Sequence, residues 1–144
     1  MASPSQQPDV IEQRVAKLLA EMTLVEKIGQ MTQRNAGSQH ELEVVTRQLR
    51  EGRIGSVLNQ VNVDVLNELQ RVAVEESRLG IPLLVGRDVI HGFKTVMPIP
   101  LGQAASFNPD VVRDGARVAA REAATAGINW TFAPMIDVSR DPRW

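Results

Sequence analysis

The sequence predicts an α/β fold with a parallel sheet, and three observations carry that prediction. Short apolar segments of strand length alternate with longer segments whose apolar residues recur at helical spacing. Glycines stand at the ends of the helical segments, and most links between segments are short. A strand–helix–strand–helix–strand order with short links is typical of right-handed βαβ units, which place their strands parallel.

The composition is that of one globular domain. The 144 residues suffice for a core, with 43% hydrophobic and 23% charged residues and a net charge of −1. No basic face or charged tail indicates nucleic acid as a partner. Because cysteine is absent, disulfides and thiolate metal sites are excluded, and two histidines without a carboxylate cluster argue against zinc. We therefore expect no metal and no cofactor.

The amino-terminal residues 1–9, "MASPSQQPD", are polar and predict a flexible lead without the apolar core of a signal peptide. Residues 10–144 form the predicted folded region. No apolar run approaches the roughly 18 residues that span a membrane, so we expect no membrane partner. The expected location is the cytoplasm, or the periplasm or exterior if an export signal was removed.

The first half of the chain contains five predicted helices or strands before residue 60. Residues 10–22 are expected to be helical, and Thr23 with Glu26 fits a capping box that starts a second short helix. Residues 28–33, "IGQMTQ", are expected to form a weak first strand. A helix over residues 40–52 then ends at a glycine, and "IGSVL" at residues 54–58 is a short buried strand.

The second half repeats the alternation. Residues 63–80 are expected to be helical, and "LLV" at residues 83–85 is the core of the third strand. Asn108 and Pro109 mark the start of a helix that runs to residue 127. The last strand is "INWTFAP" at residues 128–134, and its Trp130 is expected in the core.

One link is out of pattern. The residues from Asp88 to Phe107 carry prolines, glycines and no clear periodicity, whereas strand-to-helix links usually have about 2–6 residues. Asp88, His91 and Lys94 come directly after the third strand, at the carboxyl end where parallel sheets bind ligands. These side chains would suit a hydroxylated ligand. The link is therefore the candidate binding site.

Each candidate also has a structural alternative. Asp88 could cap its own loop, His91 could be packed, and Lys94 could be only solvated. The last segment, "DVSRDPRW", occupies the corresponding position after the fourth strand and would face the link. Its charged residues favour an internal ion pair over ligand contact, and its tryptophan could stack on a sugar or cover the end of the fold: Asp137, Arg140, Asp141, Arg143 and Trp144.

Five ordered stretches resemble the amino-terminal part of glycoside hydrolase family 3, in its β-glucosidase branch. They are "MTLVEKIGQM", "GRIGSVLN", "ESRLGIPLLVGRDVIHGFKTVMPIPLG", "AASFNPD" and "GINWTFAPMIDVSRDPRW". Together they cover nearly everything from about residue 10 to the end. The resemblance implies a TIM-like (β/α)8 barrel, of which this chain would be the first half, with parallel strands and a helical amino-terminal lead.

The resemblance also implies retaining hydrolysis of terminal β-linked glucose, with one carboxylate as nucleophile and another as acid/base. Asp88 matches an aspartate that binds sugar hydroxyls in this family. Lys94 belongs to the same lip of the sugar site, meaning the loop from Asp88 to Lys94, at a position where the family commonly has arginine. A lysine there keeps the positive charge but lacks the forked geometry of a guanidinium. His91 lies between them as a supporting residue. Met97, at a position that is often phenylalanine, is expected to affect packing only.

No catalytic residue is expected within this chain. The nucleophile and the acid/base are expected downstream of Trp144, which makes the chain an inactive amino-terminal fragment. Half a barrel leaves strand edges unpaired and an apolar interior uncovered, so we expect self-association through them. The substrate is expected to be a β-glucoside or oligosaccharide.

Other functions remain open. The chain could be a non-catalytic half-barrel that binds sugar or complements another fragment. It could also belong to a β-xylosidase or β-N-acetylhexosaminidase relative, although "DVIHG" is more similar to the glucosidase branch. An unrelated barrel enzyme such as an aldolase would need a Schiff-base lysine at a strand end, and none is placed there.

Overall fold

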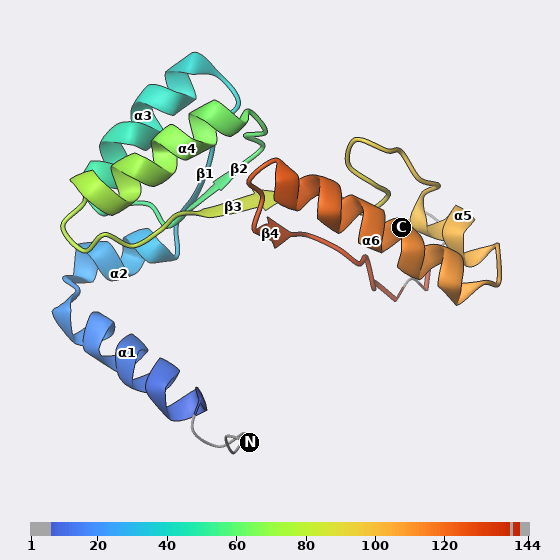
Figure 1. Cartoon of the computed structure of the whole chain (residues 1–144), viewed down its shortest axis with the longest axis horizontal. Coiled ribbons are helices and arrows are strands. Elements are labelled where there is room, and N and C mark those ends of the chain that lie inside the picture. Colours follow the sequence, from blue (N-terminus) through green and yellow to red (C-terminus); the bar gives the residue numbers. More distant parts are fainter. Residues whose placement is uncertain (1–6, 139, 142–144) are drawn as a thin grey trace.

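A computed structural model describes residues 7–138, 140 and 141, and it shows one parallel sheet flanked by helices (Figure 1). The strands follow one another in sequence order across the sheet. They are β1 (Gln33–Asn35), β2 (Ser56–Leu58), β3 (Leu84–Arg87) and β4 (Trp130–Thr131). Every neighbouring pair is parallel. The predicted parallel α/β architecture is therefore confirmed.

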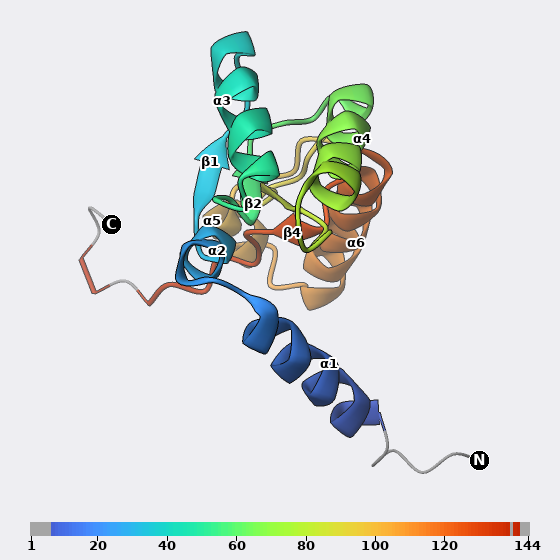
Figure 2. The same cartoon turned by 90° about the vertical axis from the view of Figure 1, so that its left-hand side faces the viewer.

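Three helices connect these strands and lie on the same side of the sheet (Figure 2). They are α3 (Gln39–Arg50), α4 (Val63–Arg71) and α6 (Pro109–Thr125). A single wider π-helical turn, Val72–Glu76, continues α4. The capping residues Ser38, Asn62 and Asn108 each accept a backbone N–H at the first turn, which explains where the three helices begin.

The core lies between the sheet and these helices. Apolar side chains of the strands meet the apolar stripe of each helix. The fully buried residues among them include Val45, Val57, Val72, Leu83 and Val85. Small alanines on α6, at positions 119 and 123, allow that helix to approach the sheet closely.

The opposite face of the sheet is open. Along β3, Val85 is buried whereas its neighbour Leu84 is 48% exposed, because successive side chains point to opposite faces. Trp130 on β4 is 40% exposed, so its predicted place in the core is wrong. It lies on the terminal strand of the sheet and packs edge to face on Phe132, with 4.9 Å between ring centroids. An apolar open face is what the first half of a barrel would present.

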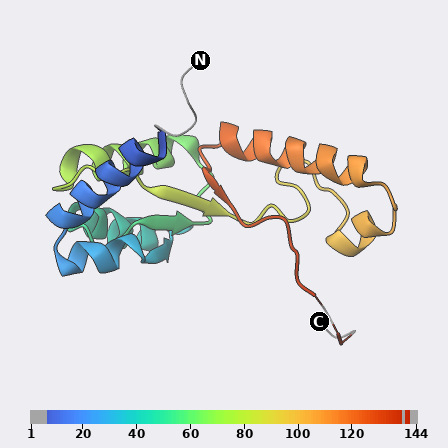
Figure 3. The same cartoon turned by 90° about the horizontal axis from the view of Figure 1, so that it is seen from below.

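The amino-terminal helices differ in how they are anchored. Helix α1 (Gln7–Glu21) extends away from the sheet, and its apolar Ile11 is 59% exposed (Figures 1 and 3). It starts within the predicted flexible lead, of which residues 1–6 lie outside the described residues. Helix α2 (Leu24–Gln30) starts at the predicted capping box of Thr23 and Glu26. It occupies residues 28–30, so the first strand begins only at residue 33 and the predicted strand over 28–33 is wrong.

Two further predictions need correction. The long link contains a short helix, α5 (Pro100–Ala104), which starts at a proline and was not expected because five residues are too few to show periodicity. The last strand has two residues, where seven were expected, and these two pair with Gly86 and Arg87 at the end of β3.

Close packing of α2 on the turn before β2 generates a prediction. An added Cβ at Gly29 would lie 2.1 Å from the carbonyl oxygen of Gly52, so Gly29→Ala must push α2 away. We expect destabilisation of about 1–3 kcal/mol, the usual cost of overpacking. A Cβ added at Gly115 in α6 would lie 3.7 Å from the Met97 side chain, an ordinary contact. Because alanine favours a helix over glycine, Gly115→Ala should stabilise the fold by about 0.5–1 kcal/mol. Urea denaturation of both variants tests this, and equal effects would contradict it.

Candidate functional site

The three predicted site residues lie at the carboxyl end of β3. Asp88 follows the last residue of the strand, and His91 and Lys94 lie in the loop beyond it. All three side chains are exposed, and none has a hydrogen-bond or ion-pair partner among the residues that the structure describes. Asp88 thus does not cap its own loop there, and His91 is not packed. The three polar groups are available to a ligand.

The backbone that carries these side chains is tightly folded. The Met97 amide donates to the His91 carbonyl at 2.7 Å, and the Gly92 amide donates to the Val89 carbonyl at 3.2 Å. Gly92 has φ +102°, and a Cβ there would lie 2.0 Å from the Thr95 carbonyl oxygen. Only glycine fits this turn. The segment therefore has a defined shape although its side chains are exposed.

The side chain of Glu122, on α6, fixes the same segment through hydrogen bonds. Its Oε2 accepts the backbone N–H groups of Lys94 at 2.8 Å and Thr95 at 2.9 Å, and its Oε1 accepts the Thr95 hydroxyl at 2.6 Å. The hydrogen bonds from Thr95 are the main reason that the pKa of this carboxyl lies below its usual range. One carboxylate thus fixes the backbone of Lys94, and the charge of the Lys94 side chain also helps to lower the pKa of this carboxyl.

A row of polar side chains crosses the carboxyl ends of the other strands. Arg87 donates from Nη1 to Asn59 Oδ1 at 2.7 Å, and Asn59 donates from Nδ2 to Asn35 Oδ1 at 3.1 Å. Asn35 in turn donates to Glu41 Oε1 at 2.6 Å. Glu41 also closes the capping box of α3 with Ser38, and the Ser38 and Asn35 side chains lower the pKa of its carboxyl.

Sequence reasoning did not identify this row or the role of Glu122. The row could have been found, since Asn59 directly follows a predicted strand, as Asp88 does. Glu122 lies near the end of a long helix, 28 residues from Lys94, and only the tertiary structure brings the two together.

The last segment is only partly described. Asp137 and Arg140 are exposed, and Asp141 is half-buried. Arg143 and Trp144 lie outside the described residues, so the predicted ion pair and the stacking role of the tryptophan remain predictions. Among the described residues, no group of three or more His, Asp or Glu side chains could hold a metal ion.

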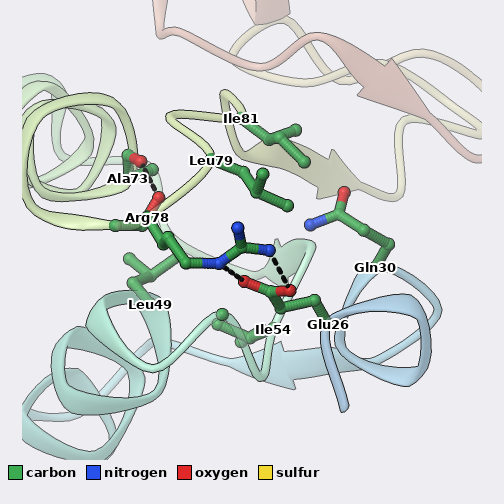
Figure 4. A pocket seen from close by; sticks show the side chains of 10 residues that line it. Glu26, Gln30, Leu49, Ile54, Ala73, Arg78, Leu79 and Ile81 are labelled. Carbon is green, nitrogen blue, oxygen red and sulfur yellow. Dashed lines mark hydrogen bonds and ion pairs between the residues drawn. The ribbon is translucent and has the colours of Figure 1, made fainter. Parts of the chain in front are cut away.

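A second polar cluster lies between α2 and the segment that follows α4, around a hollow of about 20 Å³ (Figure 4). Glu26 and Arg78 face each other there, with Arg78 Nη2 donating to Glu26 Oε2 at 2.6 Å and Nε donating to Oε1 at 2.9 Å. Glu26 is only 8% exposed. The space is too small for a sugar, and the charges neutralise each other, so this cluster is structural.

Comparison with known proteins identifies the family. The family model for the glycosyl hydrolase family 3 N-terminal domain matches residues 23–144. The chain belongs to glycosyl hydrolase family 3. Within the family, the chain is 44% identical over 137 residues to the periplasmic β-glucosidase of Salmonella typhimurium, and 28% identical over 158 aligned positions to a lysosomal β-glucosidase of Dictyostelium discoideum.

Solved structures of this family share the fold. A β-glucosidase from Listeria innocua in complex with gluconolactone superposes with a TM-score of 0.78 at 38% identity, and covers 92% of this chain. The same enzyme in complex with glucose gives 0.77 at 40% identity. These matches, together with the four parallel strands, confirm the predicted TIM-like barrel portion.

The family 3 chain spans about a fifth of the relatives that it matches. The alignments cover 95% of this chain but 18% of the Salmonella protein, 90% but 19% of the Dictyostelium protein, and 92% but 20% of the Listeria structure. No helix among the described residues is long and apolar enough to cross a membrane.

The Glu26–Arg78 pair predicts how stability depends on pH. Hydrogen bonds from Arg78, and then from Thr23, lower the pKa of Glu26 to about 2 in the folded chain, against 4.5 for the free group. A lowered folded-state pKa means that the pair contributes fully above about pH 4.5 and is lost as the pH falls towards 2. We therefore expect the unfolding temperature to decrease as the pH is lowered from about 4.5 towards 2.

Glu26→Gln should lower the unfolding temperature at pH 7 and flatten its fall in the acid window. Glu68→Gln is the matched control, because Glu68 pairs with Arg71 on the surface and exposed pairs contribute at most about 1 kcal/mol. If both variants lost the same stability at pH 7, the special role of Glu26 would be refuted.

Proposed function

We propose that this family 3 chain supplies the first part of the barrel of a retaining β-glucosidase, which releases terminal β-linked glucose. The support is the 44% identity to a protein named β-glucosidase, combined with the three unpartnered polar side chains on a fixed loop at the carboxyl end of β3. Polar groups displayed there are typical of ligand sites in barrels. The observation that carries the proposal is the free lip formed by Asp88, His91 and Lys94.

In this proposal the lip binds the sugar and the chemistry is performed elsewhere. The Asp88 carboxylate accepts hydrogen bonds from neighbouring sugar hydroxyls, and the Lys94 ammonium donates to a hydroxyl oxygen. His91 supports them from between. Retaining hydrolysis needs two carboxylates about 5–5.5 Å apart across the glycosidic bond. We assign neither role to a residue of this chain, and place both downstream of Trp144.

A second substrate class has its own support. A putative β-xylosidase of Formosa agariphila is 33% identical over 153 residues, and a Dickeya chrysanthemi protein named for both β-glucosidase and β-xylosidase is 28% identical. Xylose lacks the hydroxymethyl group of glucose, so a preference between the two sugars depends on contacts to that group. A non-catalytic sugar-binding role for the isolated chain follows from the same lip.

Removal of the Asp88 carboxylate tests the proposed site. We expect the 144-residue chain to bind glucose weakly, and Asp88→Ala to weaken binding at least roughly tenfold, because hydrogen bonds to a charged group contribute about 1.5–3 kcal/mol. Ligand-observed NMR with glucose and with xylose measures both affinities. Asp64→Ala, which removes another exposed carboxylate from the first turn of α4, should leave binding unchanged.

Hydrolysis is measured in the same samples with an aryl β-glucoside, and we expect none from this chain. Turnover would contradict the placement of the nucleophile and would require one among its own carboxylates. Binding that Asp88→Ala leaves intact would refute the lip.

We also propose that the isolated chain self-associates. Among the described residues, β1 and β4 each have only one paired neighbour, and the open face exposes apolar side chains such as Leu84. Unpaired edges and exposed apolar surface favour association. Sedimentation velocity over a concentration series should show a weight-average mass that rises with concentration. A monomer at every concentration would overturn this expectation.

A further inference from the structure

The row formed by Arg87, Asn59, Asn35 and Glu41 has a direction. Each member donates a hydrogen bond to the next, from the guanidinium at the end of β3 to the carboxylate at the start of α3. A cation stands at one end and an anion at the other, so each asparagine amide can have only one orientation. Hydrogen bonds in such a chain polarise one another and fix its members.

The backbone conformation at the middle of the row is consistent with this single direction of the hydrogen bonds. Asn59 has φ +66°, a left-handed conformation that asparagine tolerates better than most residues. The backbone N–H of Asn59 also donates to the Gly86 carbonyl at 3.4 Å, next to Arg87. The conformation turns the Asn59 side chain along the strand ends, towards both of its partners.

Arg87 has more donors than this row uses. A guanidinium carries five N–H groups, and one of its terminal nitrogens donates to Asn59. The Nε atom of Arg87 is buried and has no hydrogen-bond partner among the described residues. No carboxylate among them forms an ion pair with Arg87 either. A buried donor without a partner requires an explanation, and an absent ligand is one.

The position of Arg87 indicates what that ligand is. It is the last residue of β3, and Asp88 of the proposed sugar lip is the next residue in the chain. Its guanidinium reaches Asn59 at the end of β2, so its unused N–H donors lie along the carboxyl edge of the sheet, the edge that also carries the proposed lip. Hydroxyl oxygens accept hydrogen bonds from guanidinium groups, while the same hydroxyls donate to carboxylates.

We propose that Arg87 is a further sugar-binding residue, whose unused guanidinium donors bind hydroxyl oxygens of the sugar held by Asp88. Asn59, Asn35 and Glu41 are positioning residues that fix the plane of the guanidinium. The inference rests on the proposed function, since it adds a donor to the same sugar site. It makes the site reach across the ends of three strands instead of one loop.

The test uses the 144-residue chain with ¹⁵N-labelled arginine, at a concentration below the onset of self-association. Glucose is titrated into the unmodified chain and into Arg87→Lys, Asn59→Gly and Asp88→Ala. Arg87→Lys keeps the charge and removes the fork. Asn59→Gly removes the amide and keeps a residue that accepts positive φ. Arg34→Lys is the matched control, because Arg34 lies on β1 and is exposed.

If the proposal is correct, glucose shifts the Nε–H resonance of Arg87, and Arg87→Lys weakens binding roughly tenfold. Asn59→Gly should move the Arg87 resonance before any glucose is added and also weaken binding, while Arg34→Lys changes neither. A row that is only structural would lower the unfolding temperature of Asn59→Gly without changing the affinity for glucose.

The outcomes separate the two proposals. Binding that is lost in Asp88→Ala but unchanged in Arg87→Lys overturns the role of Arg87 and leaves the proposed function intact. An Arg87 resonance that does not respond to glucose, in a chain that binds it, has the same consequence. A chain that binds no glucose at any concentration overturns the sugar lip itself and Arg87 with it.

Discussion

The Glu26 carboxylate is the interaction on which the amino-terminal half of this family 3 chain depends. It accepts four hydrogen bonds, two from Thr23 at the start of α2 and two from Arg78 beyond α4. Arg78 reaches further, to the carbonyl of Glu21 at the end of α1. Gly52, which ends α3, lies so close that a Cβ there would be 2.9 Å from the Glu26 side chain. One nearly buried anion thus joins segments from four parts of the sequence.

This arrangement gives the two ends of the sheet opposite character. On the side of α2, the charges of Glu26 and Arg78 satisfy each other, and no room is left for a ligand. At the carboxyl ends of the strands, the side chains of Asp88 and Lys94 have no hydrogen-bond or ion-pair partner among the described residues. Pairing stabilises a fold, whereas unpaired polar groups at a fixed position contribute binding. The charged groups are paired where α2 packs, and polar side chains are left unpaired at the strand ends, where loops are free to vary.

Local signals predicted much of this fold, and long-range contacts account for what they missed. The capping boxes of Thr23–Glu26 and Ser38–Glu41 determine where two helices begin. Because each box uses residues only three positions apart, helix starts of this type can be predicted from the sequence. The first strand was misplaced because Ile28 and Gly29 look like strand residues until the capped helix is followed through them. Trp130 was misassigned since an apolar run does not reveal that one face of its strand is open. Asp88 was found from its place after a strand, but Glu122 is defined only by the loop that packs on it.

The two carboxylates that support the candidate site both come from the helices. Glu122 holds the lip from α6, and Glu41 orders the row of amides from the first turn of α3, so both carboxylates come from the helical layer. Neither needs the open face of the sheet to be covered. The shape of the lip is therefore set by contacts within these residues, before any further strand is added to the sheet. In the proposed function, other segments would then bring the two catalytic carboxylates to a loop whose shape is already set.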